Sequence, residues 1–164
     1  IIPRGVAALG YTLQLPVQEK FLSTDEELRD QLAILLGGRV AEELTFGSIS
    51  SGAANDLERA SEIARDMVTR LGMSEDLGAL TYGRRQQLEF LGRDFSESRN
   101  YSDETARQID SAVRQLVDEA HDRAEAILKQ QQDALESIAQ QLQEREVISG
   151  EEVAAAIAAQ EPAS

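Results

Sequence analysis

The chain contains no cysteine and only one histidine, His121, among its 164 residues. The absence of cysteine excludes disulfides, thiolate metal sites and cysteine nucleophiles. A single histidine means that a site requiring two imidazoles cannot be completed by these residues alone. Tryptophan is also absent, and aromatic residues make up 4% of the chain. Several common classes of active site are therefore excluded at the outset.

Positive charge is in the minority. The chain has 16 Lys and Arg residues against 30 Asp and Glu residues, which gives a formal net charge of −14 at pH 7. The isoelectric point of the sequence is about 4.4. A polyanion of this strength is repelled by phosphate backbones, so we expect no nucleic-acid partner.

Long hydrophobic runs are missing too. The most apolar stretch, Leu32 to Leu36, is far shorter than the roughly 20 residues of a membrane-spanning helix. The first residues are Ile-Ile-Pro-Arg, with no methionine, and they do not resemble a signal peptide. This start suggests an internal cut, so we expect a fragment of a longer protein, with the length of one domain.

Helical patterning dominates what is present. Thr24 and Glu27 have the spacing of a capping box before an apolar face that continues to Leu44, and Ser149 and Glu152 repeat that spacing. Apolar periodicity predicts five helices. They lie at about 24–46, from 53–55 to about 71, from Ser102 to about 128, at 133–145, and from Ser149 through Val153 and Ile157.

Strand-like alternation is confined to the N-terminus, where Tyr11, Leu13 and Leu15 alternate with polar residues. Ile1 and Ile2 could pair with this run and form a small two-stranded β ribbon. Residues 74–100 are predicted to be a loop with a short strand at 79–82. The sequence therefore predicts a mainly α fold of about five helices with an N-terminal β ribbon, and a disordered tail at 161–164.

The single histidine lies one helical turn after an acid, in Asp118-Glu119-Ala120-His121. Helical di-iron sites use such a pair, but they need it twice. We therefore interpret His121 as part of a water-facing helix surface. Adjacent carboxylates such as Glu42-Glu43 diverge by about 100° on a helix, so they do not form an acid–base pair by themselves.

Two features are harder to explain as ordinary surface. Gly37-Gly38 lies inside an otherwise strong helix, where each glycine costs up to about 1 kcal/mol relative to alanine. We infer that another helix approaches closely there, although a helix break is the alternative. The segment Ser50-Ser51-Gly52-Ala53-Ala54-Asn55-Asp56 leads from a loop into a helix. Asp56 is the best-placed carboxylate for a site, although acids are favoured at helix N-termini in any case.

Several motifs of this chain, in order, resemble the peptidase domain of the FtsH family of membrane-anchored AAA+ zinc proteases. The resemblance covers nearly the whole chain, and the ordered set is specific although each piece alone is weak. The motifs are Ile2-Pro3-Arg4-Gly5, Leu9-Gly10-Tyr11-Thr12, Leu36-Gly37-Gly38-Arg39-Val40-Ala41-Glu42-Glu43, Phe46-Gly47, Ser51-Gly52-Ala53-Ala54-Asn55-Asp56, Ala64-Arg65-Asp66-Met67-Val68, Phe90-Leu91-Gly92-Arg93 and Tyr101-Ser102-Asp103-Glu104-Thr105-Ala106.

The resemblance implies a role for each of these features. In such proteases a His-Glu-x-x-His helix gives Zn²⁺ two imidazoles, and an aspartate from a later helix, here Asp56, is the third ligand. The glutamate of that motif is the general base for a water that zinc acidifies. Glu42 is expected to orient a zinc ligand. The Gly37-Gly38 helix is expected to pack against the histidine helix, whose absence would expose an apolar patch around Leu32–Leu36.

The sequence itself contains no His-Glu-x-x-His. We therefore expect residues 1–160 to form a partial zinc-peptidase domain with no catalytic residue of its own and no activity alone. The resemblance implies further parts outside these residues: an ATPase module that binds ATP and Mg²⁺, and an N-terminal membrane anchor. It also implies a homo- or hetero-hexamer that degrades unfolded and membrane polypeptides, with the peptidase domain facing the cytoplasm or the equivalent organelle compartment.

One alternative from another class remains open. The composition and periodicity fit equally well an acidic helical scaffold, or a protease relative that has lost its catalytic motif and serves as an interaction module. Asp56 discriminates between the two, because a zinc site needs a carboxylate there and a scaffold does not.

Overall fold

The computed structural model describes residues 22–83 and 101–159. Their elements are α1 (Asp25–Phe46), the short 3₁₀ helix η1 (Ser51–Ala53), α2 (Ala54–Thr69), α3 (Asp103–Gln130), α4 (Gln132–Arg145) and α5 (Gly150–Ala158). The predicted mainly α fold with five helices is confirmed for these residues, and no strand occurs among them. The predicted β ribbon and the predicted tail at 161–164 lie outside the described residues.

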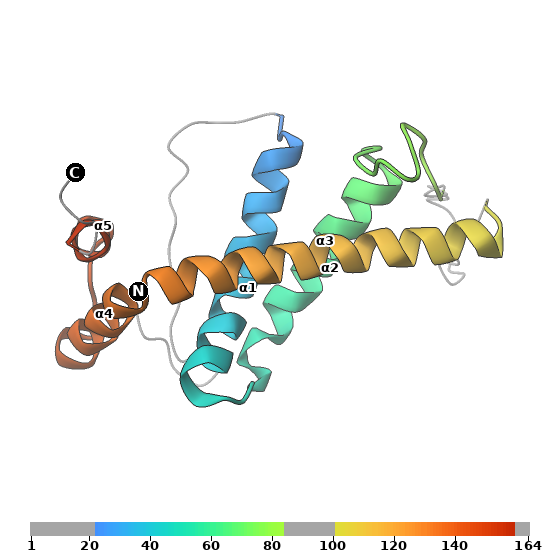
Figure 1. The fold of residues 1–164 in the computed structure, drawn as a ribbon. Coiled ribbons are helices and arrows are strands. Elements are labelled where there is room, and N and C mark those ends of the chain that lie inside the picture. Colours follow the sequence, from blue (N-terminus) through green and yellow to red (C-terminus); the bar gives the residue numbers. More distant parts are fainter. Residues whose placement is uncertain (1–21, 84–100, 160–164) are drawn as a thin grey trace, which may run out of the picture.

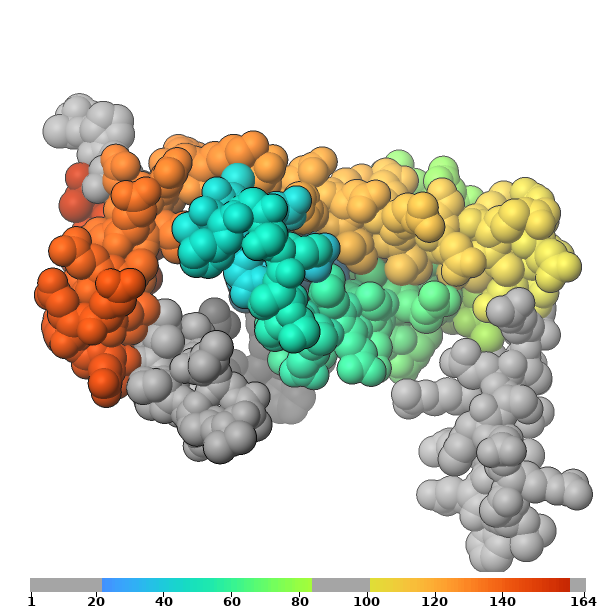
Figure 2. Space-filling view, turned by 90° about the horizontal axis from the view of Figure 1, so that it is seen from below, coloured from blue at the N-terminus to red at the C-terminus, as the bar shows by residue number. Residues whose placement is uncertain are grey.

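The first two helices form an antiparallel pair that the third crosses. α1 and α2 lie side by side and are joined by η1, and α3 runs steeply across both of them (Figure 1). α4 and α5 lie beyond the C-terminal end of α3. Seen from below, an open gap separates α4 from the turn between α1 and α2 (Figure 2). The described residues therefore form a three-helix body and a C-terminal helix pair.

The three crossing helices share one apolar core. Its fully buried large side chains are Leu32, Leu36 and Val40 of α1, Met67 and Val68 of α2, and Ile109 of α3. Small residues such as Ala60, Ala64 and Ala120 let the helices approach each other closely. Because α1, α2 and α3 all contribute side chains to this core, the positions of α1 and α2 depend on α3.

The helix starts follow the sequence signals closely. Thr24 Oγ1 accepts a hydrogen bond from Glu27 N at 3.3 Å, and Glu27 Oε2 accepts one from Thr24 N at 3.1 Å. Ser149 and Glu152 form the same reciprocal pair at the start of α5. Such boxes satisfy backbone donors that have no partner within the helix. Both capping boxes predicted from the sequence are therefore confirmed.

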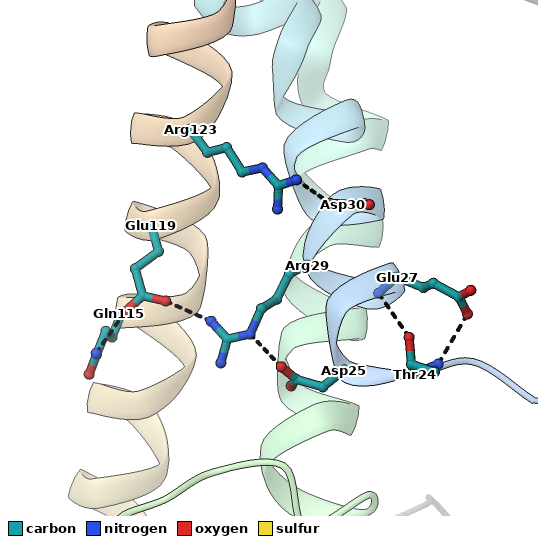
Figure 3. Close-up of polar contacts among 8 residues, drawn as sticks. All are labelled: Thr24, Asp25, Glu27, Arg29, Asp30, Gln115, Glu119 and Arg123. Carbon is teal, nitrogen blue, oxygen red and sulfur yellow. Dashed lines mark hydrogen bonds and ion pairs between the residues drawn. The ribbon is translucent and has the colours of Figure 1, made fainter.

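Polar contacts also fix the crossing of α1 and α3 (Figure 3). Arg29 donates from Nε to Asp25 Oδ2 and from Nη1 to Glu119 Oε2, both at 2.7 Å. These contacts, above all the hydrogen bond to Asp25, raise the pKa of Arg29. One turn further along α3, Arg123 Nη2 lies 2.5 Å from Asp30 Oδ1. The N-terminal half of α1 is thus tied to α3 at two points.

The predicted strand at 79–82 is wrong. This segment has no strand structure, because its backbone and side chain bond to the end of α2 and to its own loop. Tyr82 N donates to Thr69 O at 2.7 Å, and Tyr82 Oη donates to Leu77 O at 2.9 Å. Gly72, with φ of +64°, makes the turn out of α2. The loop therefore covers one end of the helix pair without forming a sheet.

The expected apolar patch around Leu32–Leu36 is present only in part. Leu32 is 0% exposed and Leu36 is 1% exposed, because α2 and α3 cover this face of α1. Only Ile34 of this stretch is strongly exposed, at 60%. Among the residues that the structure describes, no helix is both long enough and apolar enough to span a membrane.

Candidate functional site

The carboxylate of Glu42 holds the loop that leads into α2. Glu42 Oε2 accepts a hydrogen bond from Ser50 N at 2.9 Å, and Glu42 Oε1 accepts one from the Ser50 hydroxyl at 2.8 Å. Both bonds favour the ionised carboxylate. The backbone bond first and the hydroxyl bond second therefore lower the pKa of Glu42. The two bonds join the C-terminal turns of α1 to the start of η1.

Ser50 in turn fixes the start of η1. Its side chain is the N-cap of η1 and accepts a hydrogen bond from Gly52 N at 3.1 Å. A Cβ atom at Gly52 would lie 3.2 Å from Ser50 Oγ and 3.8 Å from Glu42 Oε1. A larger residue at this position would therefore press on the two hydrogen-bonding groups. The role of Ser50 was not predicted individually, and its spacing before Gly52 is the signal that could have found it.

Asp56 lies on the first turn of α2, immediately after η1, and is half-buried. It occupies the same third helical position as Glu27 of α1 and Glu152 of α5, which both accept a hydrogen bond from their N-cap residue. The N-cap of α2 is Ala53, which has no side-chain cap bond. Within residues 22–83 and 101–159, the carboxylate of Asp56 has no hydrogen-bond or ion-pair partner.

The carboxylate of Asp56 fits one position of a metal site and no more than one. Carboxylate oxygen is an accepted zinc ligand, and a half-buried carboxylate without a partner is free to coordinate. In the described part of the chain, however, no group of three or more His, Asp or Glu side chains could hold a metal ion. Asp56 is therefore compatible with a shared zinc site whose other ligands lie outside the described residues.

His121 contacts an acid from another helix. Its Nε2 lies 3.4 Å from Glu43 Oε2 of α1, and its Nδ1 lies 3.5 Å from Asp122 Oδ1 of α3 itself. The imidazole is 32% exposed, so the interpretation as a helix surface facing water is only partly correct. The contact with Glu43 was not predicted, because nothing local in the sequence relates two residues that are 78 positions apart.

Gly37 and Gly38 do not interrupt the helix. α1 continues through both of them to Phe46, so the alternative of a helix break is wrong. A Cβ atom built on either glycine would meet no described atom within 4 Å. Gly37 lines an open apolar hollow of about 310 Å³ with Ile34 of α1 and with Ala124 and Ile127 of α3. α3 thus crosses near Gly37, but the close approach that we inferred is not made by any described residue.

Comparison with known proteins agrees with the motifs. The sequence model of peptidase family M41 matches residues 1–156. The chain is 63% identical over 157 residues to the ATP-dependent zinc metalloprotease FtsH of Methylococcus capsulatus, covering 96% of this chain and 25% of that protein.

Two further relatives give the same result. The ATP-dependent zinc metalloprotease FtsH 4 of Synechocystis is 53% identical over 154 residues, which are 93% of this chain and 24% of that protein. FtsH of Thermotoga maritima is 51% identical over 153 residues, which are 93% of this chain and 25% of that protein. The chain thus spans about a quarter of the length of the curated relatives that it matches.

Proposed function

The chain belongs to peptidase family M41, and from this membership we propose that it is part of the peptidase domain of an ATP-dependent zinc metalloendopeptidase. The observation that carries the proposal is the match of the family over residues 1–156, together with a carboxylate, Asp56, that has no partner among the described residues. The substrates of the whole protein are unfolded and membrane polypeptides.

Asp56 is the zinc ligand that this chain contributes. Its lack of a partner supports this role, since an acid that only stabilised the start of α2 would be expected to accept a backbone hydrogen bond, as Glu27 and Glu152 do. Zinc, when bound, would act as a Lewis acid that lowers the pKa of water and so supplies a nucleophile for the peptide carbonyl. The chain's own part is to hold the Asp56 carboxylate in place.

Glu42 positions that ligand through the loop. Its two hydrogen bonds to Ser50 fix the start of η1, and η1 runs directly into the first turn of α2, where Asp56 lies. Each group in this sequence of contacts is held by the previous one, which limits the movement of the ligand. Glu42 therefore acts by orienting the zinc ligand and does not itself coordinate zinc.

The two imidazoles and the general-base glutamate come from a His-Glu-x-x-His helix that these 164 residues do not contain. That helix packs on the apolar hollow at Gly37, because a glycine has no side chain and permits a close approach. The 164 residues alone therefore bind zinc weakly and do not hydrolyse peptides. Hexamer formation, the ATPase module and the membrane anchor, with the peptidase domain on the cytoplasmic side or its organelle equivalent, belong to the whole protein.

The proposal is tested in the whole protein with the substitution Asp56→Ala. We expect the variant to lose stoichiometric zinc and casein hydrolysis while its ATPase activity remains. Glu62→Gln, which changes an exposed acid on the same helix, is the matched control and should keep all three. If Asp56→Ala retains zinc and cleaves casein, Asp56 is not a ligand. If the unsubstituted protein contains no zinc, the scaffold alternative replaces the protease.

A further inference from the structure

The last turns of α1 have no hold on the apolar core. Val40, which is 1% exposed, is the last buried residue of this helix. All six residues from Ala41 to Phe46 are partly or fully exposed, and Phe46 is 73% exposed. A helix end without buried side chains frays readily. Glu42, which holds the loop before Asp56, lies on these turns, so their position must be fixed by other contacts.

Polar contacts between α1 and α3 flank the point where the two helices cross. On the N-terminal side, Arg29 binds Glu119 and Asp30 binds Arg123 (Figure 3). On the C-terminal side, the described residues offer one such contact, between Glu43 and His121. His121 thus connects the end of α1 to α3, as the two arginine pairs connect the beginning of α1 to α3.

Glu42 and Glu43 are adjacent on α1 but contact different parts of the molecule. Consecutive side chains on a helix diverge by about 100°, so the two carboxylates point to different partners. Glu42 bonds to Ser50 of the loop, and Glu43 contacts the imidazole of α3. The end of α1 is therefore held on one side by the loop that leads to Asp56 and on the other side by His121.

We propose that His121 is a positioning residue for the metal site: by holding Glu43, it fixes the end of α1, from which Glu42 holds Ser50 and the start of α2. His121 touches neither metal nor substrate. The inference rests on the proposed function of Asp56 as a zinc ligand. It adds a residue of α3, which lies 65 positions after Asp56 in the sequence, to the structure that supports this ligand.

The chemistry of the contact suits this role. Each ring nitrogen of His121 faces a carboxylate oxygen, that of Glu43 at Nε2 and that of Asp122 at Nδ1. A neutral imidazole donates one hydrogen bond and an imidazolium donates two, so the contact with Glu43 is made by the tautomer protonated on Nε2 or by the imidazolium. The pair is partly exposed, so it contributes little to global stability. A local effect can therefore be separated from unfolding.

The test compares His121→Ala and His121→Gln in the whole protein. The glutamine amide can still donate a hydrogen bond to Glu43, whereas alanine cannot. We expect His121→Ala to weaken zinc binding by about three- to tenfold, at or below the roughly 10- to 100-fold typical of groups that bond directly to a ligand. Peptidase kcat should fall with little change in KM, and His121→Gln should restore both to within about twofold of the original protein.

The matched control is Arg29→Gln, which removes the contact with Glu119 between the same two helices on the other side of their crossing. It should leave zinc binding unchanged. Hydrogen exchange of the backbone amides provides a readout that needs no zinc. His121→Ala should speed exchange in residues 41–53 but not in residues 25–36, because only the end of α1 and the following loop are released.

Three results would overturn the proposal. They are unchanged exchange in residues 41–53 of His121→Ala, an equal loss of zinc in Arg29→Gln, and a loss in His121→Gln as large as that in His121→Ala. Failure of the proposed function itself is seen separately. If Asp56→Ala keeps its zinc while His121→Ala still speeds local exchange, the tie exists but the ligand has been assigned wrongly.

Discussion

Glu42 and Ser50 meet through two hydrogen bonds, at 2.9 Å to the serine backbone nitrogen and 2.8 Å to its hydroxyl, across eight positions of sequence. The carboxylate thereby connects the C-terminal turns of α1 to the loop before α2. A carboxylate that accepts two bonds in this way is sensitive to protonation and to amide substitution, and both can be tested.

The stability contributed by these two hydrogen bonds depends on pH, and the direction of the dependence is defined. The bonds from Ser50 lower the pKa of Glu42 below its ordinary value of 4.5, so the folded state favours the ionised form. The contribution to stability is therefore present above pH 4.5 and is lost as the pH falls through the lowered pKa. We expect hydrogen exchange in residues 48–53 to accelerate over this acid range, after correction for the intrinsic exchange rate. Glu42→Gln should exchange quickly at every pH, and equal protection in the variant at pH 7 would contradict the prediction.

A second carboxylate whose hydrogen bonds are sensitive to acid, Glu152, lies at the start of α5. Hydrogen bonds from Ser149 N and from Arg145 lower the pKa of Glu152 to about 2. Its contribution is fully present above pH 4.5 and disappears between pH 4.5 and about pH 2. Nuclear magnetic resonance of α5 should show loss of helical shifts over this range before α1 unfolds. In Glu152→Gln the helix should be weakened already at pH 7, and a helix as well formed as in the original chain would contradict this role.

Gly37→Ala should act in opposite directions in two settings. Nothing described lies near the new methyl group, so alanine should stabilise α1 of the 164-residue chain by roughly 0.5–1 kcal/mol through its higher helix propensity. This corresponds to a rise in melting temperature of a few degrees. In the whole protein, the same methyl group should weaken zinc binding, because it separates α1 from the histidine helix. Glu26→Ala, at an exposed position of α1, is a control that should leave zinc binding unchanged. A gain in zinc affinity would argue against close packing at Gly37.

The buried face of α1 should be far more sensitive than its exposed face. Leu32→Ala removes a side chain that is 0% exposed, and it should lower the free energy of unfolding by about 2–5 kcal/mol. Ile34→Ala changes a side chain that is 60% exposed, and it should alter stability by less than about 1 kcal/mol. Urea unfolding of the two variants measures the difference. Similar losses in both would mean that α1 does not pack on α2 and α3 as described.

Local signals were read correctly from the sequence, and signals that depend on distant residues were not. The capping boxes at Thr24 and Ser149 were predictable because both partners lie within four positions of each other. The contact between Glu43 and His121 was not predictable, since it arises only when α3 crosses α1. The wrong strand at 79–82 has a similar cause, because the backbone of Tyr82 bonds to the end of a helix that the local pattern does not include.

The candidate site depended on both kinds of information. The loop-to-helix segment marked Asp56 as a placed carboxylate, but the resemblance to a family was needed to suggest zinc. The structure then distinguished Asp56 from Glu27 and Glu152, which occupy the same helical position and have partners. The expected patch at Leu32–Leu36 is reduced to the hollow at Ile34 and Gly37, because α2 and α3 cover Leu32 and Leu36, which the sequence did not indicate.

The C-terminal helix pair has a consequence for how this molecule can vary. α4 packs against α3 and α5, and neither α4 nor α5 contacts α1 or α2 in the described part of the chain. We therefore expect substitutions in α4 and α5 to leave the hydrogen bonds between Glu42 and Ser50 unchanged. For the experimenter, this end of the chain is a suitable place for a fluorescent label or a fusion partner. A reporter there would be attached to helices that contact neither α1 nor α2 in the described residues.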